Sequence, residues 1–256
     1  MTPLDDTLFD APTPLMVLVR PQMGENIGAA ARAMLNFGCA RMRVVAPRDG
    51  WPNPRATAMA SGASPVLERA GLFDSLPEAI GDCDYVYATT ARGRGLTKPV
   101  LTPEHAMREA RAMVAEGKRV AVLFGPERAG LENPDVARAN AIITVPVNPA
   151  FYSLNLAQCV LLVAYEFARQ DSAVSPEVME LAGTDFATHI EREKLGDHVE
   201  ERLASAGFFF PPAKADMMRL NLRNMWARLA LTRADVQTLH GMMRALVRGQ
   251  RGGGDT

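Results

Sequence analysis

Several features that define specialised classes of protein are scarce or absent in this sequence of 256 residues. Its three cysteines (Cys39, Cys83 and Cys159) form no CxxC pair, and its four histidines offer no zinc-type spacing, so we expect reduced, buried thiols and no metal site. No uncharged run reaches the ~18 residues that a membrane helix requires. The formal net charge of −1 gives no overall basic field, so any contact with nucleic acid must come from local patches.

The common cofactor loops are missing as well. Gly24 and Gly28 follow an apolar run but lack the GxGxxG spacing, and neither a GxxxxGK[ST] loop nor a Gly-x-Ser-x-Gly elbow occurs. Nicotinamide and nucleoside triphosphate chemistry therefore have little support. The first ten residues include three aspartates and no basic start before an apolar core, so we expect no signal peptide and a cytoplasmic location.

What is present is the composition of a globular protein, 48% hydrophobic and 22% charged, which excludes a wholly disordered chain. Apolar runs rich in Val and Ile predict strands at 15–19, 42–46, 84–89, 120–124 and 141–147. Helical patterns lie between and after them, at about 27–37, 103–116 and 154–170. This alternation predicts an α/β fold with a parallel sheet and flanking helices, which places ligands beyond the carboxyl ends of the strands.

The composition changes after residue 170. Residues 171–183 are typical of a linker, and 184–256 predict a small all-α extension with a frayed tail. Helices are expected there at about 184–206, 213–231 and 233–248. From Lys214 to Arg251 there are eight basic residues against two acidic ones. Such a pattern fits either a solvated helix face or a surface that follows phosphates.

Three loops that follow expected strands carry the polar residues of interest. In the first, Asn26 is placed to cap the next helix, and Arg32 lies inside that helix, which we expect to be largely buried. A buried arginine needs an anionic or carbonyl partner. The second loop turns at a Gly-Pro pair and carries Glu127. In the third, Ser153 is the expected N-cap, and Asn155 is an unusual choice for the first turn of an apolar helix.

Together these loops resemble the motifs of the SpoU, or TrmH-like, branch of the SPOUT RNA methyltransferases. The first motif is present as Asn26, Gly28 and Arg32, the second as Gly125, Glu127 and Gly130, and the third as Ser153, Leu154 and Asn155. The resemblance covers about residues 14–170. The extension also resembles the TrmJ subgroup, through residues 217–242 and the loop at 89–94.

The resemblance implies a fold with a C-terminal trefoil knot, an S-adenosyl-L-methionine cofactor and a homodimer with its site near the interface. The implied reaction is methyl transfer to a ribose 2′-hydroxyl of tRNA, at the pyrimidine at nucleotide 32. The expected cofactor-binding residues are Thr89, Thr90, Ala91, Gly125, Val145, Tyr152, Ser153 and Leu154. The expected catalytic residues are Arg32, Asn26, Glu127, Ser153 and Asn155, and the expected RNA contacts are Arg92, Arg94, Arg223 and Arg228.

A guanidinium is effectively never deprotonated in proteins, so Arg32 is not expected to act as a base. Our hypothesis is that Arg32 clamps a phosphate or the developing alkoxide, while Asn26 holds its geometry and Glu127 orients it or accepts from the ribose. Ser153 and Asn155 would position the same groups. Three alternatives stay open at this stage: another RNA or tRNA position, a non-catalytic RNA-binding module, and an α/β enzyme that acts on a small molecule.

Overall fold

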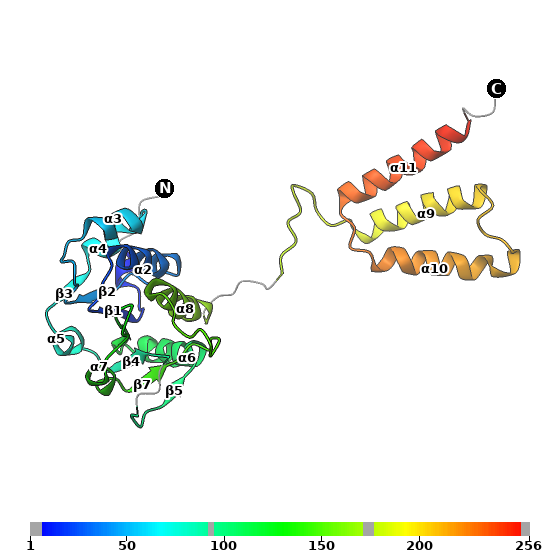
Figure 1. Cartoon of the computed structure of the whole chain (residues 1–256). Coiled ribbons are helices and arrows are strands. Elements are labelled where there is room, and N and C mark those ends of the chain that lie inside the picture. Colours follow the sequence, from blue (N-terminus) through cyan, green and yellow to red (C-terminus); the bar gives the residue numbers. More distant parts are fainter. Residues whose placement is uncertain (1–6, 92–94, 171–176, 252–256) are drawn as a thin grey trace. The chain divides into compact units, whose positions relative to one another are not determined.

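The computed structural model describes residues 7–91, 95–170 and 177–251, and the chain divides into two compact units, Met1–Ala173 and Val174–Thr256. Each unit has a hydrophobic core of its own. The first contains the sheet and the three motifs. The second is built from helices (Figure 1).

A parallel sheet forms the centre of the first unit. Its strands are β1 (Leu15–Val19), β2 (Met42–Val45), β3 (Gly71–Phe73), β4 (Tyr85–Thr89), β5 (Val100–Leu101), β6 (Val120–Phe124) and β7 (Ala141–Ile143). Over the described ranges their order is β3-β2-β1-β6-β4-β7-β5, and every neighbouring pair is parallel, which confirms the predicted parallel sheet of an α/β fold. The loops that follow β1, β6, β4 and β7 therefore leave the same edge of the sheet side by side.

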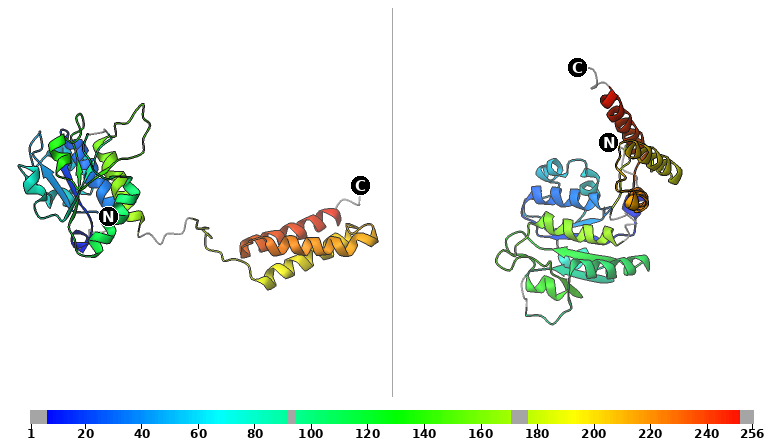
Figure 2. Two further views of the ribbon diagram at one scale, coloured as in Figure 1. Left: turned by 90° about the horizontal axis from the view of Figure 1, so that it is seen from below. Right: turned by 90° about the vertical axis from the view of Figure 1, so that its right-hand side faces the viewer.

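Helices cover both faces of this sheet (Figure 1; Figure 2). They are α1 (Thr7–Asp10), α2 (Gly24–Asn36), α3 (Pro54–Ala60), α4 (Ser64–Glu68), α5 (Leu76–Ile80), α6 (Pro103–Ala115), α7 (Asn133–Ala137) and α8 (Leu156–Arg169). On one face α8 packs between α2 and α6. On the other face lie α5 and α7. A parallel sheet needs such cover because both of its faces are apolar.

Strand β1 shows how the sequence builds the two cores. Met16 and Leu18 contribute to the core beneath α2 and α8, whereas Leu15, Val17 and Val19 pack on the opposite face with α5 and α7. All five side chains are buried. With both faces occupied by apolar packing, polar side chains are left to the two edges of the sheet.

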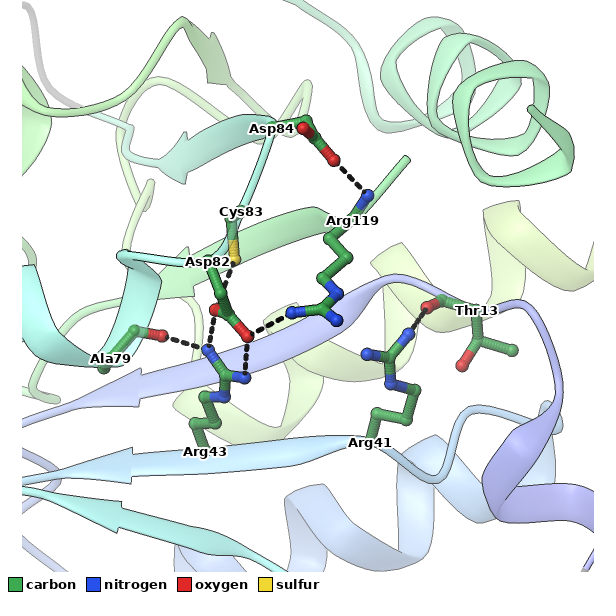
Figure 3. Close-up of polar contacts among 8 residues, drawn as sticks. All are labelled: Thr13, Arg41, Arg43, Ala79, Asp82, Cys83, Asp84 and Arg119. Carbon is green, nitrogen blue, oxygen red and sulfur yellow. Dashed lines mark hydrogen bonds and ion pairs between the residues drawn. The ribbon is translucent and has the colours of Figure 1, made fainter. Parts of the chain in front are cut away.

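The edge at the amino ends of the strands holds a network of ion pairs and hydrogen bonds (Figure 3). Both terminal nitrogens of Arg43 donate to the carboxylate of Asp82, at 2.6 and 2.8 Å, and Arg119 donates to the same carboxylate at 2.8 Å. The backbone N–H of Arg119 donates to Asp84. The contact with Arg43 holds the pKa of Asp82 well below its usual range. This network joins segments that precede β4 and β6 to strand β2, at the edge opposite the three motifs.

Helix α2, which carries the first motif, lies unusually close to α3. A Cβ atom at Gly28 would lie 2.1 Å from the backbone oxygen of Ala56, so no larger residue fits there without moving one of the helices. In α3, Asn53 caps the first turn by accepting from the N–H groups of Arg55 and Ala56. The glycine of the first motif thus fixes the distance between two helices.

The structure corrects several expected boundaries. The strand expected at 141–147 ends at Ile143. The N–H of Thr144 still donates to the backbone oxygen of Leu101, but Pro146 has no N–H with which to continue the pairing. Helix α2 begins at Gly24 rather than near residue 27, and α8 begins at Leu156 rather than 154. Strands β3 and β5 and the short helices α3, α4, α5 and α7 were not expected. The linker expected at 171–183 lies partly outside the described residues.

The second unit contains three long helices and a single 3-10 turn within the described part of residues 174–256. They are α9 (His189–Ser205), η1 (Pro212–Lys214), α10 (Ala215–Arg228) and α11 (Arg233–Arg251). Its core is small: among the described residues, the buried hydrophobic side chains are those of Ala187, Leu195, Val199 and Val236. The expected helix at 184–206 begins only at His189, because Thr188 and Glu191 form a capping box.

Candidate functional site

The three motifs meet at the carboxyl edge of the sheet. The first motif follows β1, the second follows β6 and the third follows β7. Thr89 is the last residue of β4, and Thr90 and Ala91 follow it. These four strands are consecutive neighbours in the order β1-β6-β4-β7. The convergence follows directly from a parallel sheet in which neighbouring strands deliver their loops to one edge.

A chain of hydrogen bonds joins one side chain from each motif. The amide nitrogen of Asn26 donates to Glu127 at 2.8 Å, and the amide nitrogen of Asn155 donates to the side-chain oxygen of Asn26 at 3.0 Å. Glu127 also accepts from the backbone N–H groups of Gln22, at 2.9 Å, and Met23, at 3.2 Å. The sequence predicted the meeting of these motifs, but it did not predict the two backbone donors.

The chemistry of the two end groups fixes the direction of these bonds. An ionised Glu127 can only accept, so Asn26 must turn its NH₂ group toward it and its oxygen away. The oxygen of Asn155 is already used, since it accepts from the N–H groups of Ala157, at 2.8 Å, and Gln158, at 3.4 Å. Asn155 therefore has only its NH₂ group to offer Asn26. Only one orientation of each of the two side-chain amides therefore satisfies the network.

The N-cap of α8 is Asn155, not Ser153 as expected from the sequence. The side chain of Gln158 completes a capping box by accepting from the backbone N–H of Asn155 at 3.3 Å. Asn26 does not cap α2 either: the residue at that position is Met23, and Asn26 lies inside the first turn. Asn26 thus has both ends of its amide available for bonds between the motifs, whereas Asn155 has its NH₂ group.

A pocket lies beside this network. It is lined by all eight residues expected to bind the cofactor: Thr89, Thr90, Ala91, Gly125, Val145, Tyr152, Ser153 and Leu154. It is also lined by ten residues that the sequence analysis did not assign to it: Phe124, Pro126, Glu127, Arg128, Ala129, Gly130, Ile143, Val147, Leu156 and Cys159. The alternation of Val145 and Val147 along the sequence is the signal that could have indicated Val147 as a second apolar wall residue.

Gly125 is required by the loop itself. A Cβ atom there would lie 2.1 Å from the backbone nitrogen of Leu131 and 2.4 Å from the carbonyl carbon of Gly130. Gly130 has φ +66° and donates its N–H to the oxygen of Pro126 at 2.8 Å. The two glycines of the second motif therefore form a tight loop whose main chain builds part of the pocket wall.

The interior end of the pocket is neutral. Thr89 is buried and donates its hydroxyl to the backbone oxygen of Leu123 at 2.8 Å. Burial raises the pKa of the Cys159 thiol to about 11, so the thiol stays protonated at neutral pH and acts as a small apolar wall residue rather than a nucleophile. Neither side chain brings a charge to the pocket.

The expectation that Arg32 is buried is wrong. Its side chain is exposed, and no hydrogen bond or ion pair joins it to another residue in the part of the chain that the structure describes. Glu127, expected to orient it, is instead engaged by Asn26 and two backbone amides. Arg32 also does not line the pocket. Its guanidinium is available to a molecule outside the chain.

The expected RNA contacts have different surroundings. Arg92 and Arg94 lie outside the described residues. In the second unit, Arg223 forms ion pairs with three carboxylates of α9, those of Glu193, Asp197 and Glu200. Arg228 is exposed, with no ion pair among the described residues. The acidic face of α9 thus neutralises part of the basic pattern noted in the sequence.

Features of two other classes of protein are absent from the described residues. No helix among them is long and apolar enough to span a membrane. Among the same residues, no three His, Cys, Asp or Glu side chains are grouped so that they could hold a metal ion.

A parallel α/β sheet with three motif loops joined at its carboxyl edge defines a methyltransferase of the SPOUT type. The solved structure of TrmJ from Z. mobilis ZM4 resembles it with a TM-score of 0.78 and 48% identity, over 91% of this chain and 99% of that one. An AdoMet-bound SpoU methyltransferase, AviRb from Streptomyces viridochromogenes, shares the fold at 18% identity and a TM-score of 0.50, over 65% of this chain and 61% of that one.

The family model named SpoU rRNA Methylase family matches residues 14–165, and the chain belongs to that family. Among curated relatives, the tRNA (cytidine/uridine/adenosine-2′-O-)-methyltransferase TrmJ of Pseudomonas aeruginosa is 33% identical over 93% of this chain and 95% of its own length. The tRNA (cytidine/uridine-2′-O-)-methyltransferase TrmJ of Yersinia pestis (strain Pestoides F) is 34% identical over 94% of this chain and 95% of its own.

Proposed function

We propose that this protein transfers a methyl group from S-adenosyl-L-methionine to a ribose 2′-hydroxyl of tRNA, at the pyrimidine at nucleotide 32. The observation that carries the proposal is the hydrogen-bond chain from Glu127 through Asn26 to Asn155, because it joins all three motifs beside one pocket. The names of the curated relatives, which are tRNA 2′-O-methyltransferases, support the substrate class.

The pocket residues fit the proposed cofactor. Apolar side chains such as Val145 and Leu154 suit the faces of an adenine ring, and the small residues Ala91, Gly125 and Gly130 leave main chain in the wall to hydrogen-bond its edges. The bound cofactor would supply a methyl group on a positively charged sulfur. AdoMet was found bound in the AviRb relative, which supports this assignment.

In the proposed reaction the residues of this chain position groups rather than form bonds. Glu127, Asn26 and Asn155 hold the first and third motifs at a fixed separation, so that the ribose oxygen meets the methyl group along a defined path. Ser153 would contact the ribose from the pocket wall. The exposed Arg32 would bind the phosphate of the target nucleotide or the developing alkoxide, as a permanent cation that needs no proton exchange.

Other parts of the proposal concern assembly and organisation. We place the catalytic SPOUT domain at residues 1–170, with the trefoil knot of the resemblance, and assign tRNA contacts to the extension at 184–256, including Arg228. A homodimer is supported by α8, on which Leu161 and Tyr165 are 37% and 44% exposed, and by its packing against α2, which carries Arg32. We also propose a cytoplasmic location, because the proposed substrate is tRNA.

The test is methylation of purified tRNA with labelled S-adenosyl-L-methionine, followed by mapping of the modified nucleotide. Wild-type protein should methylate nucleotide 32, and the same tRNA with a 2′-deoxyribose at that nucleotide should accept nothing. Arg32→Ala should lose about 10²–10³-fold in turnover, and Arg32→Lys should recover little, because a point charge does not reproduce a two-pronged contact. Methylation at another nucleotide, or of ribosomal RNA only, would contradict the proposed substrate.

A further inference from the structure

A second link between the first and second motif loops lies outside the pocket. Both terminal nitrogens of Arg20 bond the two carboxylate oxygens of Asp135, and the Arg20 guanidinium also lies 3.6 Å from Glu132. Arg20 directly follows β1, and Asp135 lies in α7, which follows the loop of the second motif. Neither residue lines the pocket.

The backbone at Arg20 is held in a conformation that arginine rarely adopts. Its φ is +48°, in the left-handed region, and its N–H donates to the oxygen of Val45 at 2.8 Å, which extends the pairing of β1 with β2 by one residue. The chain then turns through Pro21 toward α2. A strained residue of this kind persists only where its surroundings fix it, and here the side-chain contact with Asp135 does so.

Asp135 is an unusual anchor because it is buried, with 6% of its surface exposed. One of its oxygens also accepts from the backbone N–H of Glu132 at 2.9 Å, within the capping box of α7. A buried carboxylate without a cation is costly, so Arg20 and Asp135 depend on each other. Leu131, fully buried next to this cap, ties the same segment into the core.

The position of this pair matters for the site. Between Arg20 and Asn26 lie the two backbone N–H groups, of Gln22 and Met23, that donate to Glu127. The two loops are therefore joined twice: once by Arg20 with Asp135, at the outer ends, and once by Glu127 with Asn26 and these amides. A loop held at both ends cannot slide relative to its neighbour without breaking both sets of bonds.

We propose that Arg20 and Asp135 are positioning residues that keep the first motif loop in register with Glu127. The inference rests on the proposed function, since the reaction is where the register has its effect. It predicts that loss of the outer pair releases the amides of Gln22 and Met23 and misplaces Asn26, although no atom of Arg20 touches the pocket.

The test compares Arg20→Ala with Arg43→Ala in the full chain, by amide hydrogen exchange followed with NMR and by turnover on tRNA. Arg43 is a matched control, because it forms a similar bidentate ion pair with Asp82 at the opposite edge of the sheet (Figure 3). Arg20→Ala should speed exchange at Gln22 and Met23 by at least about tenfold. It should also lower kcat at saturating cofactor and tRNA by about 10²-fold, whereas Arg43→Ala should change neither.

Two conservative variants cover the case in which Arg20→Ala fails to fold. Arg20→Lys keeps the charge but cannot bond both oxygens, and Asp135→Asn keeps the shape; each should raise exchange at the same two amides, by less than Arg20→Ala where that variant folds. Unchanged exchange in the folded Arg20 variants, or equal acceleration in Arg43→Ala, would overturn the inference. The exchange result does not depend on methylation. An inactive wild-type protein would therefore reject the proposed function, and the exchange rates would still decide whether Arg20 and Asp135 hold the loop.

Discussion

Replacing Glu127 by glutamine keeps the size of the side chain but turns one of its two acceptor oxygens into a donor. In the structure Oε1 accepts from Asn26 and from the N–H of Met23, and Oε2 accepts from the N–H of Gln22. The glutamine amide can take two orientations. In the one that keeps more hydrogen bonds, its oxygen replaces Oε1 and still accepts from Asn26 and Met23, while its NH₂ group replaces Oε2 and faces the N–H of Gln22. At least one hydrogen bond to a charged acceptor is lost, and the remaining two become neutral.

A hydrogen bond to a charged group contributes about 1.5–3 kcal/mol, and the half-buried position of Glu127 favours the lower part of that range. We therefore expect Glu127→Gln to lower the free energy of unfolding of the first unit by about 2 kcal/mol. For a domain of this size that corresponds to a fall in Tm of about 4–8 °C. Scanning calorimetry of the full chain measures it directly.

The matched control is Glu25→Gln. Glu25 is a neighbouring glutamate on α2, and its only ion pair in the described residues is with the exposed Arg55, at 3.6 Å. An exposed pair at that distance contributes little, so this variant should stay within about 0.5 kcal/mol of wild type. If Glu127→Gln had the same Tm as the wild type, or if both variants lowered Tm equally, the three contacts of Glu127 would not hold the motifs together.

Three further predictions concern other parts of the chain. Asn155→Asp should keep the cap of α8 and its stability but lose the donor to the first motif and with it most of the methylation activity, whereas Asn155→Ala should lose both, with about 1 kcal/mol of stability measured by denaturant unfolding. Asp82→Asn should lower the free energy of unfolding at pH 7 by about 0.5–1 kcal/mol. Because arginine contacts lower the folded-state pKa of Asp82, that difference should shrink as the pH falls below about 4, in denaturant titrations at each pH. The rings of His198 and His240 share a hydrogen bond between their Nδ1 atoms at 2.8 Å, which requires that one of them be neutral, and burial lowers the pKa of His240. The helical unit should thus be most stable above the unfolded pKa of about 6.5 and lose stability as the pH falls below it; unfolding followed by Trp226 fluorescence should show this slope, and His240→Gln should remove it.

The sequence was sufficient to predict that the three motif loops leave the same edge of the sheet, because each follows an expected parallel strand. The resemblance of the sequence to the SpoU methyltransferases placed the pocket at the loops after β4, β6 and β7. It could not predict that Glu127 is held by the amides of Gln22 and Met23, since backbone donors leave no mark in the sequence.

The N-cap of α8 was predictable in principle. Ser153 and Asn155 are both good N-cap residues, and the deciding signal is the residue three positions later: Gln158 completes a capping box with Asn155, whereas Leu156 offers nothing to Ser153. The short helices α3, α4, α5 and α7 had a signal too, because each has proline in its first two positions.

The position of Arg32 shows where a general rule fails. Helix α2 is largely buried, and its buried face includes small residues such as Ala30, Ala31 and Ala33. Arg32 and Asn36, four residues apart, share the exposed face. A helix that is mostly buried still has one face exposed to solvent. The sequence does not show which residues of an alanine-rich helix lie on that face until the packing of the neighbouring elements is known.

The fixed polarity of the bonds between Glu127, Asn26 and Asn155 limits how the proposed reaction can dispose of a proton. Side-chain amides do not titrate near neutrality, and a proton placed on Glu127 would replace one of its three donors and loosen the loops that it holds. This network is consequently a scaffold and not a relay. The proton that leaves the ribose oxygen would therefore pass to a group outside this network, such as water or the nucleic acid itself.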